Sequence, residues 1–312
     1  MTKAAEIAAL LSGRDGFLIL THKRPDGDTI GSAAALCLAL RKAGKTAYLF
    51  PNPQFTETYR AFVEPLFAPE GFTAGCTVAV DVADDSMYAE GFAGHVDAAL
   101  DHHPSNNGYG DVSLVMPEKA AAGEIVLLVI REMGIEIDPD IADMIYIAIS
   151  TDTGCFAYGN TTADAHRAAA EMIEAGAHLE TLNKQLFRTV TAARLKLEGM
   201  IYTGLRRYRD GQINIAVISL EMMREAGATE DDLDDLAALA GRIKGNKVSV
   251  TVRELRPNYC KVSVRTGTEA DAAAICRIHN GGGHKMAAGC EISAPPDEAA
   301  DKMLEAINEV WK

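Results

Sequence analysis

Residues 99–111, ALDHHPSNNGYGD, place an aspartate and two adjacent histidines directly after a short apolar run. Carboxylates and imidazoles that lie together bind divalent cations or transfer protons. Side chains of the same two types occur elsewhere in the chain, and they would complete such a site. They are His22, Asp26 and Asp28 in HKRPDGD, Asp81 in VAVDVAD, and Asp152 in STDTG.

These candidate residues follow predicted strands. Short apolar runs alternate with helical patterns, the strands being expected at 17–21, 46–50, 76–82 and 97–101 and the helices at 29–44, 121–134, 140–154, 162–176 and 178–187. Continuous apolar strands between helices are typical of a parallel sheet that is covered on both faces. His22, Asp81 and Asp101 each come at the carboxyl end of a strand, where open α/β sheets bind ligands.

The chain length of 312 residues predicts two domains. The expected fold class is α/β, with an N-terminal parallel-sheet domain flanked by helices (1–188), a helical linker (189–210) and a smaller α/β domain with a mixed sheet (211–312) across a cleft. The second domain is predicted from alternating strand patterns at 213–220, 247–255 and 258–266, with helices expected at 221–241, 269–278 and 297–311.

Composition and charge narrow the class of protein. A formal net charge of −14 argues against a protein that holds long nucleic acid by neutralising phosphates. The six cysteines form no CxxC pair, which favours reduced thiols and a cytoplasmic location. No apolar run approaches the roughly 18 residues of a membrane span, so no membrane partner is expected. The oligomeric state is left open, with a homodimer as one expectation.

The six candidate ligands are four aspartates and two histidines, a set that suits Mn²⁺ or Mg²⁺, with Zn²⁺, Fe²⁺ or Co²⁺ as alternatives. So many carboxylates would over-charge one ion, which favours two ions that clamp a displacement at phosphorus. Taken singly, each residue has a simpler interpretation, such as a helix N-cap for Asp28 or a turn former for Asp81. Their joint occurrence at strand ends favours a site.

Five motifs resemble those of a known family. HKRPDGDTIGS, VAVDVAD, DHHP and STDTGCF resemble the four ordered motifs of the DHH phosphoesterases, and HNGGGHKMAAG (279–289) resembles the glycine-rich signature of their DHH-associated C-terminal domain. The resemblance extends over nearly the whole chain. Length and two-domain layout are most similar to the branch of nanoRNases and 3′-phosphoadenosine 5′-phosphate (pAp) phosphatases, the bifunctional oligoribonucleases.

The resemblance implies two divalent metal ions, Mn²⁺ first and Mg²⁺, Co²⁺ or Fe²⁺ as alternatives. His22, Asp26 and Asp81 would hold one ion. Asp28, Asp81, His102 and Asp152 would hold the other, with Asp81 as the bridge. Asp101 would orient a ligand imidazole, and His103 would face the phosphate as a hydrogen-bond donor or general acid.

The resemblance also implies substrate contacts, chiefly in the second domain. The backbone N–H groups of Gly281, Gly282, Gly283 and His284, before a helical stretch, are expected to form a phosphate nest. Ser263 and Arg265 would grip substrate phosphate, and Asn106 is a further expected contact. Ala157 stands where many relatives carry an arginine, and KAAAGE replaces a serine-rich helix start, so the exact substrate is left open.

The expected activity is hydrolysis of short oligonucleotides to mononucleotides and of the nucleotide bisphosphate pAp to AMP and phosphate. The nearest alternative is a phosphodiesterase for linear or cyclic dinucleotides such as pApA or cyclic di-AMP. A pyrophosphatase of the DHH type fits less well, because its C-terminal domain lacks GGGH. A non-catalytic nucleotide sensor is disfavoured by the complete ligand set, and a module for long nucleic acid by the acidic charge.

Overall fold

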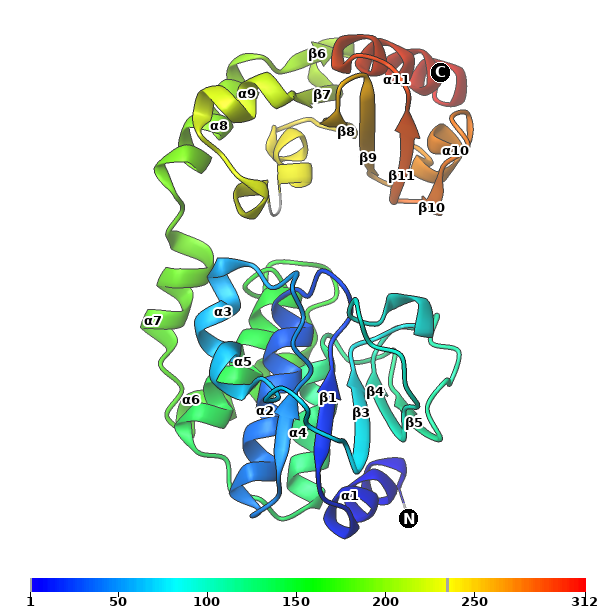
Figure 1. Ribbon diagram of the computed structural model, residues 1–312. Helices are drawn as coiled ribbons and strands as arrows, with labels where there is room; N and C mark the ends of the chain where they lie inside the picture. Colours follow the sequence, from blue (N-terminus) through cyan, green and yellow to red (C-terminus); the bar gives the residue numbers. More distant parts are fainter. Residues whose placement is uncertain (1, 234–235) are drawn as a thin grey trace. The chain divides into compact units, whose positions relative to one another are not determined.

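The structure is a computed structural model that describes residues 2–233 and 236–312. The chain divides into two compact units, Met1–Thr189 and Val190–Lys312, each with its own sheet (Figure 1). Each unit also has its own apolar core. Among the described residues, none of the helices combines the length and the apolar character that crossing a bilayer requires.

The first unit is built on a parallel sheet of five strands in the order β2-β1-β3-β4-β5. The strands are β1 (Phe17–Leu20), β2 (Ala47–Leu49), β3 (Cys76–Val80), β4 (Ala98–Asp101) and β5 (Val112–Val115). Every residue of β3 and β4 is buried, which explains why these strands are continuous apolar runs in the sequence. The edge strand β5 buries only Leu114 and was not expected.

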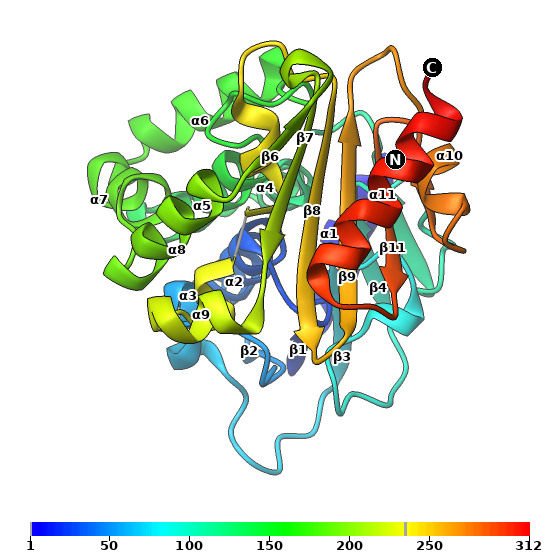
Figure 2. The same ribbon diagram turned by 90° about the horizontal axis from the view of Figure 1, so that it is seen from above.

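Helices cover this sheet, namely α1 (Lys3–Gly13), α2 (Gly27–Lys42), α3 (Glu57–Val63), α4 (Ala122–Glu132), α5 (Pro139–Asp152), α6 (Ala163–Glu174) and α7 (Leu179–Asn183), the last followed by a π-helical turn at Lys184–Arg188. Helices α2 and α5 lie side by side (Figures 1 and 2). A Cβ atom at Gly27 would come within 2.4 Å of Thr151 Oγ1, and one at Gly31 within 2.4 Å of the Met144 carbonyl oxygen. The two glycines therefore allow the contact that brings the start of α2 to the end of α5.

The second unit has a mixed sheet of six strands in the order β10-β11-β9-β8-β7-β6, in which β7 and β8 are the parallel pair. The strands are β6 (Arg206–Tyr208), β7 (Ile213–Ile218), β8 (Val248–Arg256), β9 (Tyr259–Thr266), β10 (Gly282–His284) and β11 (Ala287–Ile292). Helices α10 (Ala272–Arg277) and α11 (Pro296–Val310) bury the valines of β8 and β9 on one face. The expected α/β fold class is confirmed.

Two helical predictions in the second unit are wrong in extent. The expected helix 221–241 is the short helix α9 (Leu220–Ala226), which ends at Gly227 because this glycine adopts φ 72°. Short 3-10 turns follow at Glu230–Leu233 and Leu236–Arg242, and residues 234–235 lie outside the described residues. The expected helical linker 189–210 contains helix α8 (Ala192–Thr203) but ends in strand β6. Residues 206–208 form this strand because they pair with β7 at the edge of the sheet.

Candidate metal centre

The predicted ligands of the first unit come together at the carboxyl edge of its sheet. His22 lies just after β1, Asp81 just after β3, and Asp101 ends β4 and precedes His102 and His103. The first turn of α2 and the last residue of α5 add three aspartates. Potential ligand atoms lie within 4.8 Å of one another in three groups here: His22, Asp26 and Asp81; Asp28, His102 and Asp152; and Asp81, His102 and His103. A fourth group, His95, Asp97 and Asp111, contains none of the predicted ligands.

Asp81 is shared between two of these groups. Its Oδ2 atom lies 3.7 Å from His22 Nε2, and the same nitrogen is 3.7 Å from Asp26 Oδ1. Its Oδ1 atom lies 3.5 Å from His102 Nε2 and 3.4 Å from His103 Nδ1. The side chain is only 3% exposed, and Oδ1 has no hydrogen-bond partner among the described residues. A buried carboxylate oxygen without a hydrogen bond is costly unless a cation neutralises it, so this site fits a metal ion.

Asp28 is held by the start of a neighbouring helix. Its carboxylate accepts hydrogen bonds from Ala122 N at 2.6 Å, Gly123 N at 3.1 Å and Ser32 Oγ at 2.8 Å. Helix α4 has no side-chain N-cap of its own, so its first N–H groups are available for Asp28. The N-cap of α2 is Asp26, which accepts from Asp28 N and Thr29 N.

The carboxylates of the centre repel one another. Burial, together with repulsion from neighbouring carboxylates, raises the pKa of the Asp28, Asp81 and Asp152 carboxyl groups. Raised pKa values mean that the ionised forms are unfavourable without a counter-charge. Divalent cations with oxygen and imidazole ligands would supply that charge.

Backbone carbonyls fix the two imidazoles that are predicted to bind metal. His22 Nδ1 lies 2.8 Å from the Lys23 carbonyl oxygen, and His102 Nδ1 lies 3.2 Å from that of Lys119. Because a carbonyl oxygen only accepts, each Nδ1 carries a proton, which leaves Nε2 as the nitrogen that could bind a metal ion. This is the arrangement that metal-binding histidines generally need.

Asp101 orients His103, whereas the sequence predicts that it orients a ligand imidazole. Its Oδ1 atom accepts from His103 Nδ1 at 2.8 Å and from the His103 backbone N–H at 3.1 Å. The second bond closes an aspartate turn over two residues, and this turn draws the ring of His103 onto the same carboxylate. The hydrogen bond with Asp101 raises the pKa of His103 against the opposing effect of burial.

Asn106 was expected to touch substrate, but its amide is used within the protein. Nδ2 donates to Asp101 Oδ2 at 2.7 Å and to the Val82 carbonyl at 3.1 Å, while Oδ1 accepts from Gly108 N at 2.8 Å. Sequence reasoning overlooked Tyr109, whose hydroxyl donates to the same Val82 carbonyl at 2.8 Å. An aromatic residue within a polar loop was the available signal.

The substrate residues predicted in the second unit share one face of its sheet. Ser263 lies opposite Gly289, which lies opposite Gly282, and Arg265 lies opposite Ala287, which lies opposite His284. Directly opposed residues on antiparallel strands point to the same side. The Ser263 hydroxyl, the Arg265 guanidinium and the His284 imidazole therefore lie on one face, beside residues with small side chains or none.

The expected phosphate nest before a helix is wrong in its structure. GGGH contributes to β10 and forms a hairpin with β11, because Lys285 and Met286 make the turn and the following residues pair with β9. A Cβ atom at Gly281 would come within 2.3 Å of the Gly289 carbonyl oxygen, and one at Gly283 within 2.6 Å of that of Ala287. These two glycines serve the close approach of the strands. Gly282 faces open space.

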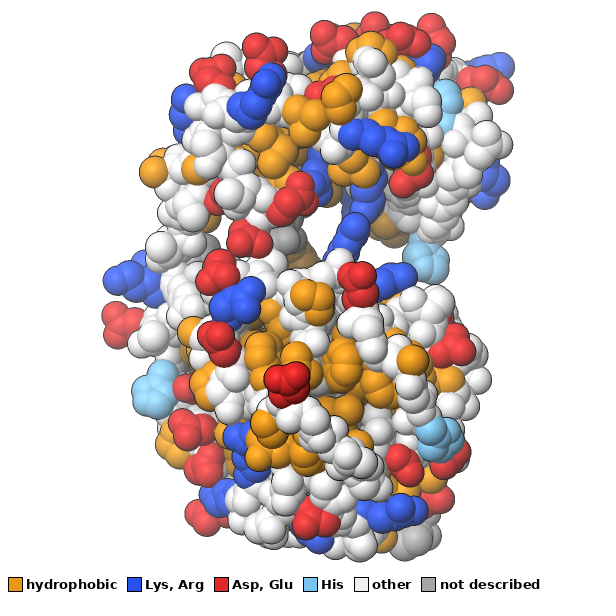
Figure 3. All heavy atoms as spheres, viewed as in Figure 1, with side chains coloured by type: hydrophobic (Ala, Val, Ile, Leu, Met, Phe, Trp, Pro, Cys, Tyr) orange, Lys and Arg blue, Asp and Glu red, His pale blue; other side chains and the backbone are white. Residues whose placement is uncertain are grey.

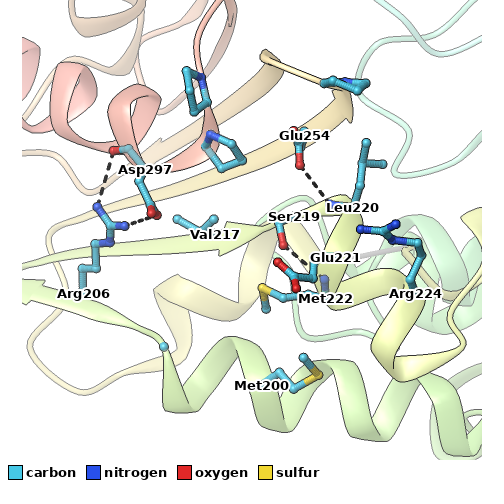
Figure 4. A pocket seen from close by; sticks show the side chains of 14 residues that line it. Met200, Arg206, Val217, Ser219, Leu220, Glu221, Met222, Arg224, Glu254 and Asp297 are labelled. Atoms are coloured by element: carbon cyan, nitrogen blue, oxygen red, sulfur yellow. Dashed lines mark hydrogen bonds and ion pairs between the residues drawn. The ribbon is translucent and has the colours of Figure 1, made fainter.

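A separate pocket of about 540 Å³ opens in the second unit near the ends of β7 and β8. Arg206 pairs with Asp297 at one end, and Glu254 accepts from the Leu220 N–H at another (Figure 4). None of the residues predicted to bind substrate lines it.

The comparisons with known proteins agree with the motifs. Residues 16–149 match the DHH family, N-terminal domain, and residues 212–312 match the DHHA1 domain. A protein of Thermus thermophilus named bifunctional oligoribonuclease and PAP phosphatase is 34% identical over 97% of this chain and 93% of its own. A protein of the same name from Bacillus subtilis is 26% identical over 98% of both chains.

Among solved structures, an exopolyphosphatase-related protein from Bacteroides fragilis superposes with a TM-score of 0.87 at 21% identity, covering 98% of this chain and 96% of its own. At 21% identity, this likeness establishes the fold alone. The sequence matches establish the family, and they extend over both domains. The resemblance inferred from the five motifs is confirmed, and the chain belongs to the DHH family, with a DHHA1 domain in its C-terminal part.

Proposed function

We propose that this chain is a phosphoesterase that uses two divalent ions, Mn²⁺ before Mg²⁺, Co²⁺ or Fe²⁺, to hydrolyse short oligonucleotides to mononucleotides and pAp to AMP and phosphate. The observation that carries the proposal is the position of Asp81. Its two carboxylate oxygens face two separate groups of ligand atoms, and one of these oxygens is buried without a hydrogen-bond partner among the described residues. A carboxylate with one oxygen toward each group could hold a cation on either side.

The residues divide into two ligand sets. His22, Asp26 and Asp81 would hold one ion, and Asp28, His102, Asp152 and Asp81 the other. Bound there, the ions would supply a nucleophile from water and neutralise charge on the phosphoryl oxygens. Hydrogen bonds within the protein already orient several of these side chains. The first N–H groups of α4 hold Asp28. The carbonyls of Lys23 and Lys119 hold the two imidazoles.

His103 would act as the general acid. Its Nδ1 atom is engaged by Asp101, so Nε2 is the atom left to donate a proton to the leaving oxygen. The carboxylate of Asp101 favours the protonated imidazole, which raises the pKa of His103. The side chain is 41% exposed, as access to a substrate requires.

The choice of substrate is supported by the activity that the names of the two curated relatives give, oligoribonuclease and PAP phosphatase. In the second unit, Ser263, Arg265, His284 and the backbone at Gly282 would contact phosphate, with the guanidinium as its bidentate partner. On the face seen in Figure 3, acidic and basic side chains are interspersed on each unit. Together with the net charge of −14, this favours short substrates over long strands.

A parallel assay tests the proposed function. Purified protein is incubated with Mn²⁺ and pAp, a 5-mer RNA, pApA or pyrophosphate, and each reaction is repeated with a chelator. We expect mononucleotides from the 5-mer and AMP with phosphate from pAp, and no turnover after chelation. Turnover of pApA alone would indicate a dinucleotide phosphodiesterase. Tight binding without turnover would indicate a sensor, and either result contradicts the proposal.

A further inference from the structure

The backbone at Asp81 is strained. Asp81 adopts φ 58°, in the left-handed region that residues other than glycine rarely occupy. Such a conformation is unfavourable for a residue with a Cβ atom and persists only where the surroundings hold it. Here it turns the chain at the end of β3, so that the side chain faces His22, His102 and His103.

Four hydrogen bonds hold the backbone around Asp81, two on the peptide that precedes it and two on the carbonyl of the next residue, Val82. Its own N–H donates to the Leu100 carbonyl at 2.8 Å. The Val80 carbonyl before it accepts from Thr29 Oγ1 at 3.0 Å. The Val82 carbonyl after it accepts twice, from Tyr109 Oη at 2.8 Å and from Asn106 Nδ2 at 3.1 Å.

We propose that Tyr109 is a positioning residue for the bridging carboxylate, and that it acts with Asn106 by locking the Val82 carbonyl. The inference rests on the proposed function, because it assigns to these two residues a role at the same metal centre. Both side chains donate a hydrogen bond to the Val82 carbonyl. Both act through the backbone that follows Asp81.

The surroundings of Tyr109 fix its hydroxyl. Its ring packs edge-on against Tyr88 with centroids 5.5 Å apart, and the backbone of Tyr88 forms a bridge with His22. Both tyrosines pack against a buried cluster formed by Leu20, Ala79, Val82 and Val96. Burial raises the pKa of the Tyr109 phenol, so the hydroxyl stays protonated and donates to the carbonyl. Tyr109 therefore connects the segments that carry His22 and Asp81.

Asn106 extends the same network to the predicted acid. The amide nitrogen that donates to Val82 also donates to Asp101 Oδ2, and the other oxygen of Asp101 holds His103. One loop after the histidine pair thus fixes both the bridging carboxylate and the proton donor. Loss of either donor to Val82 is expected to let the Asp81 peptide relax toward ordinary φ values.

The test compares Tyr109→Phe with Tyr48→Phe. Both changes remove one phenolic oxygen and keep the ring, and Tyr48 lies on β2, where its ring pairs with Phe72. We expect Tyr109→Phe to lower Mn²⁺ affinity, measured by titration calorimetry of the metal-free protein, by about 10-fold. The kcat for pAp should fall while KM is unchanged, because Tyr109 does not touch substrate. Tyr48→Phe should match the wild type in both measurements.

Asn106→Ala gives a second version of the test that leaves the aromatic cluster untouched, and it is expected to show the same fall in Mn²⁺ affinity. Wild-type Mn²⁺ affinity in both folded variants would overturn the inference, as would a rise in KM with constant kcat. If the wild-type protein did not hydrolyse pAp, the proposed function would fail. The comparison of Mn²⁺ affinities would still decide the positioning role.

Discussion

Asp81→Asn is expected to lower the hydrolysis of pAp and short RNA by about 1000-fold, equivalent to about 4 kcal/mol of transition-state stabilisation. Asp81 is the residue whose two oxygens face both ligand groups. An amide would keep the shape but remove the charge that would hold two cations together. The rate of AMP release with saturating Mn²⁺ measures the loss. Asp140→Asn, at an exposed position in the first turn of α5, is the matched control and should keep wild-type activity.

Asp81→Asn is also expected to stabilise the metal-free protein against unfolding by about 1–3 kcal/mol at neutral pH. The folded state raises the pKa of Asp81 through burial and neighbouring carboxylates. A raised carboxyl pKa favours folding at low pH, and this contribution is lost as the pH rises through the folded value. The gain from Asp81→Asn should therefore shrink on acidification. Urea unfolding in a chelator at several pH values measures it, and a loss of stability at neutral pH would contradict the repulsion described above.

His103→Gln is expected to lower kcat for RNA by about 100- to 10,000-fold, the range for loss of a general acid. A substrate with a good leaving group, such as a p-nitrophenyl nucleotide ester, needs little protonation of the leaving oxygen. The loss should therefore be much smaller with that ester. Mn²⁺ affinity should stay close to that of the wild type, because the proposed ligand sets do not include His103.

The partner of His103 gives a related expectation. Asp101 holds the pKa of His103 above its usual value, so the alkaline limb of the kcat profile should move to lower pH in Asp101→Asn. If His103→Gln lowered the activity on RNA and on the p-nitrophenyl ester equally, His103 would have a role in substrate binding and not in proton transfer. An unchanged pH profile in Asp101→Asn would contradict the proposed proton donor.

The sequence predicted the parallel sheet and the proximity of the candidate ligands well, because both follow from local patterns. Buried parallel strands are apolar throughout, and their carboxyl ends must meet at one edge of the sheet. His22, Asp81 and Asp101 could therefore be placed together from their positions after strands. The edge strand β5 gave no such signal, since only Leu114 in it is buried.

Side-chain partners were harder to predict, because they depend on turns and on tertiary contacts. The aspartate turn at Asp101 selects His103 over His102, and the selection follows from backbone geometry that spacing does not encode. Asn106 was expected to face substrate but satisfies its amide within the loop. The glycines of GGGH suggested a nest, yet Gly281 and Gly283 are required by strand packing. In each case the residue type suggested one contact, and the fold places the residue against a different partner.

The number of Mn²⁺ ions bound per chain tests the central claim most directly. Metal-free protein is titrated with Mn²⁺, and electron paramagnetic resonance follows the free ion and any spin coupling between bound ions. We expect two ions per chain in the wild type, with a coupled signal that Asp81→Asn abolishes. A single bound ion, no bound ion, or two uncoupled ions that Asp81→Asn leaves unchanged would contradict the account.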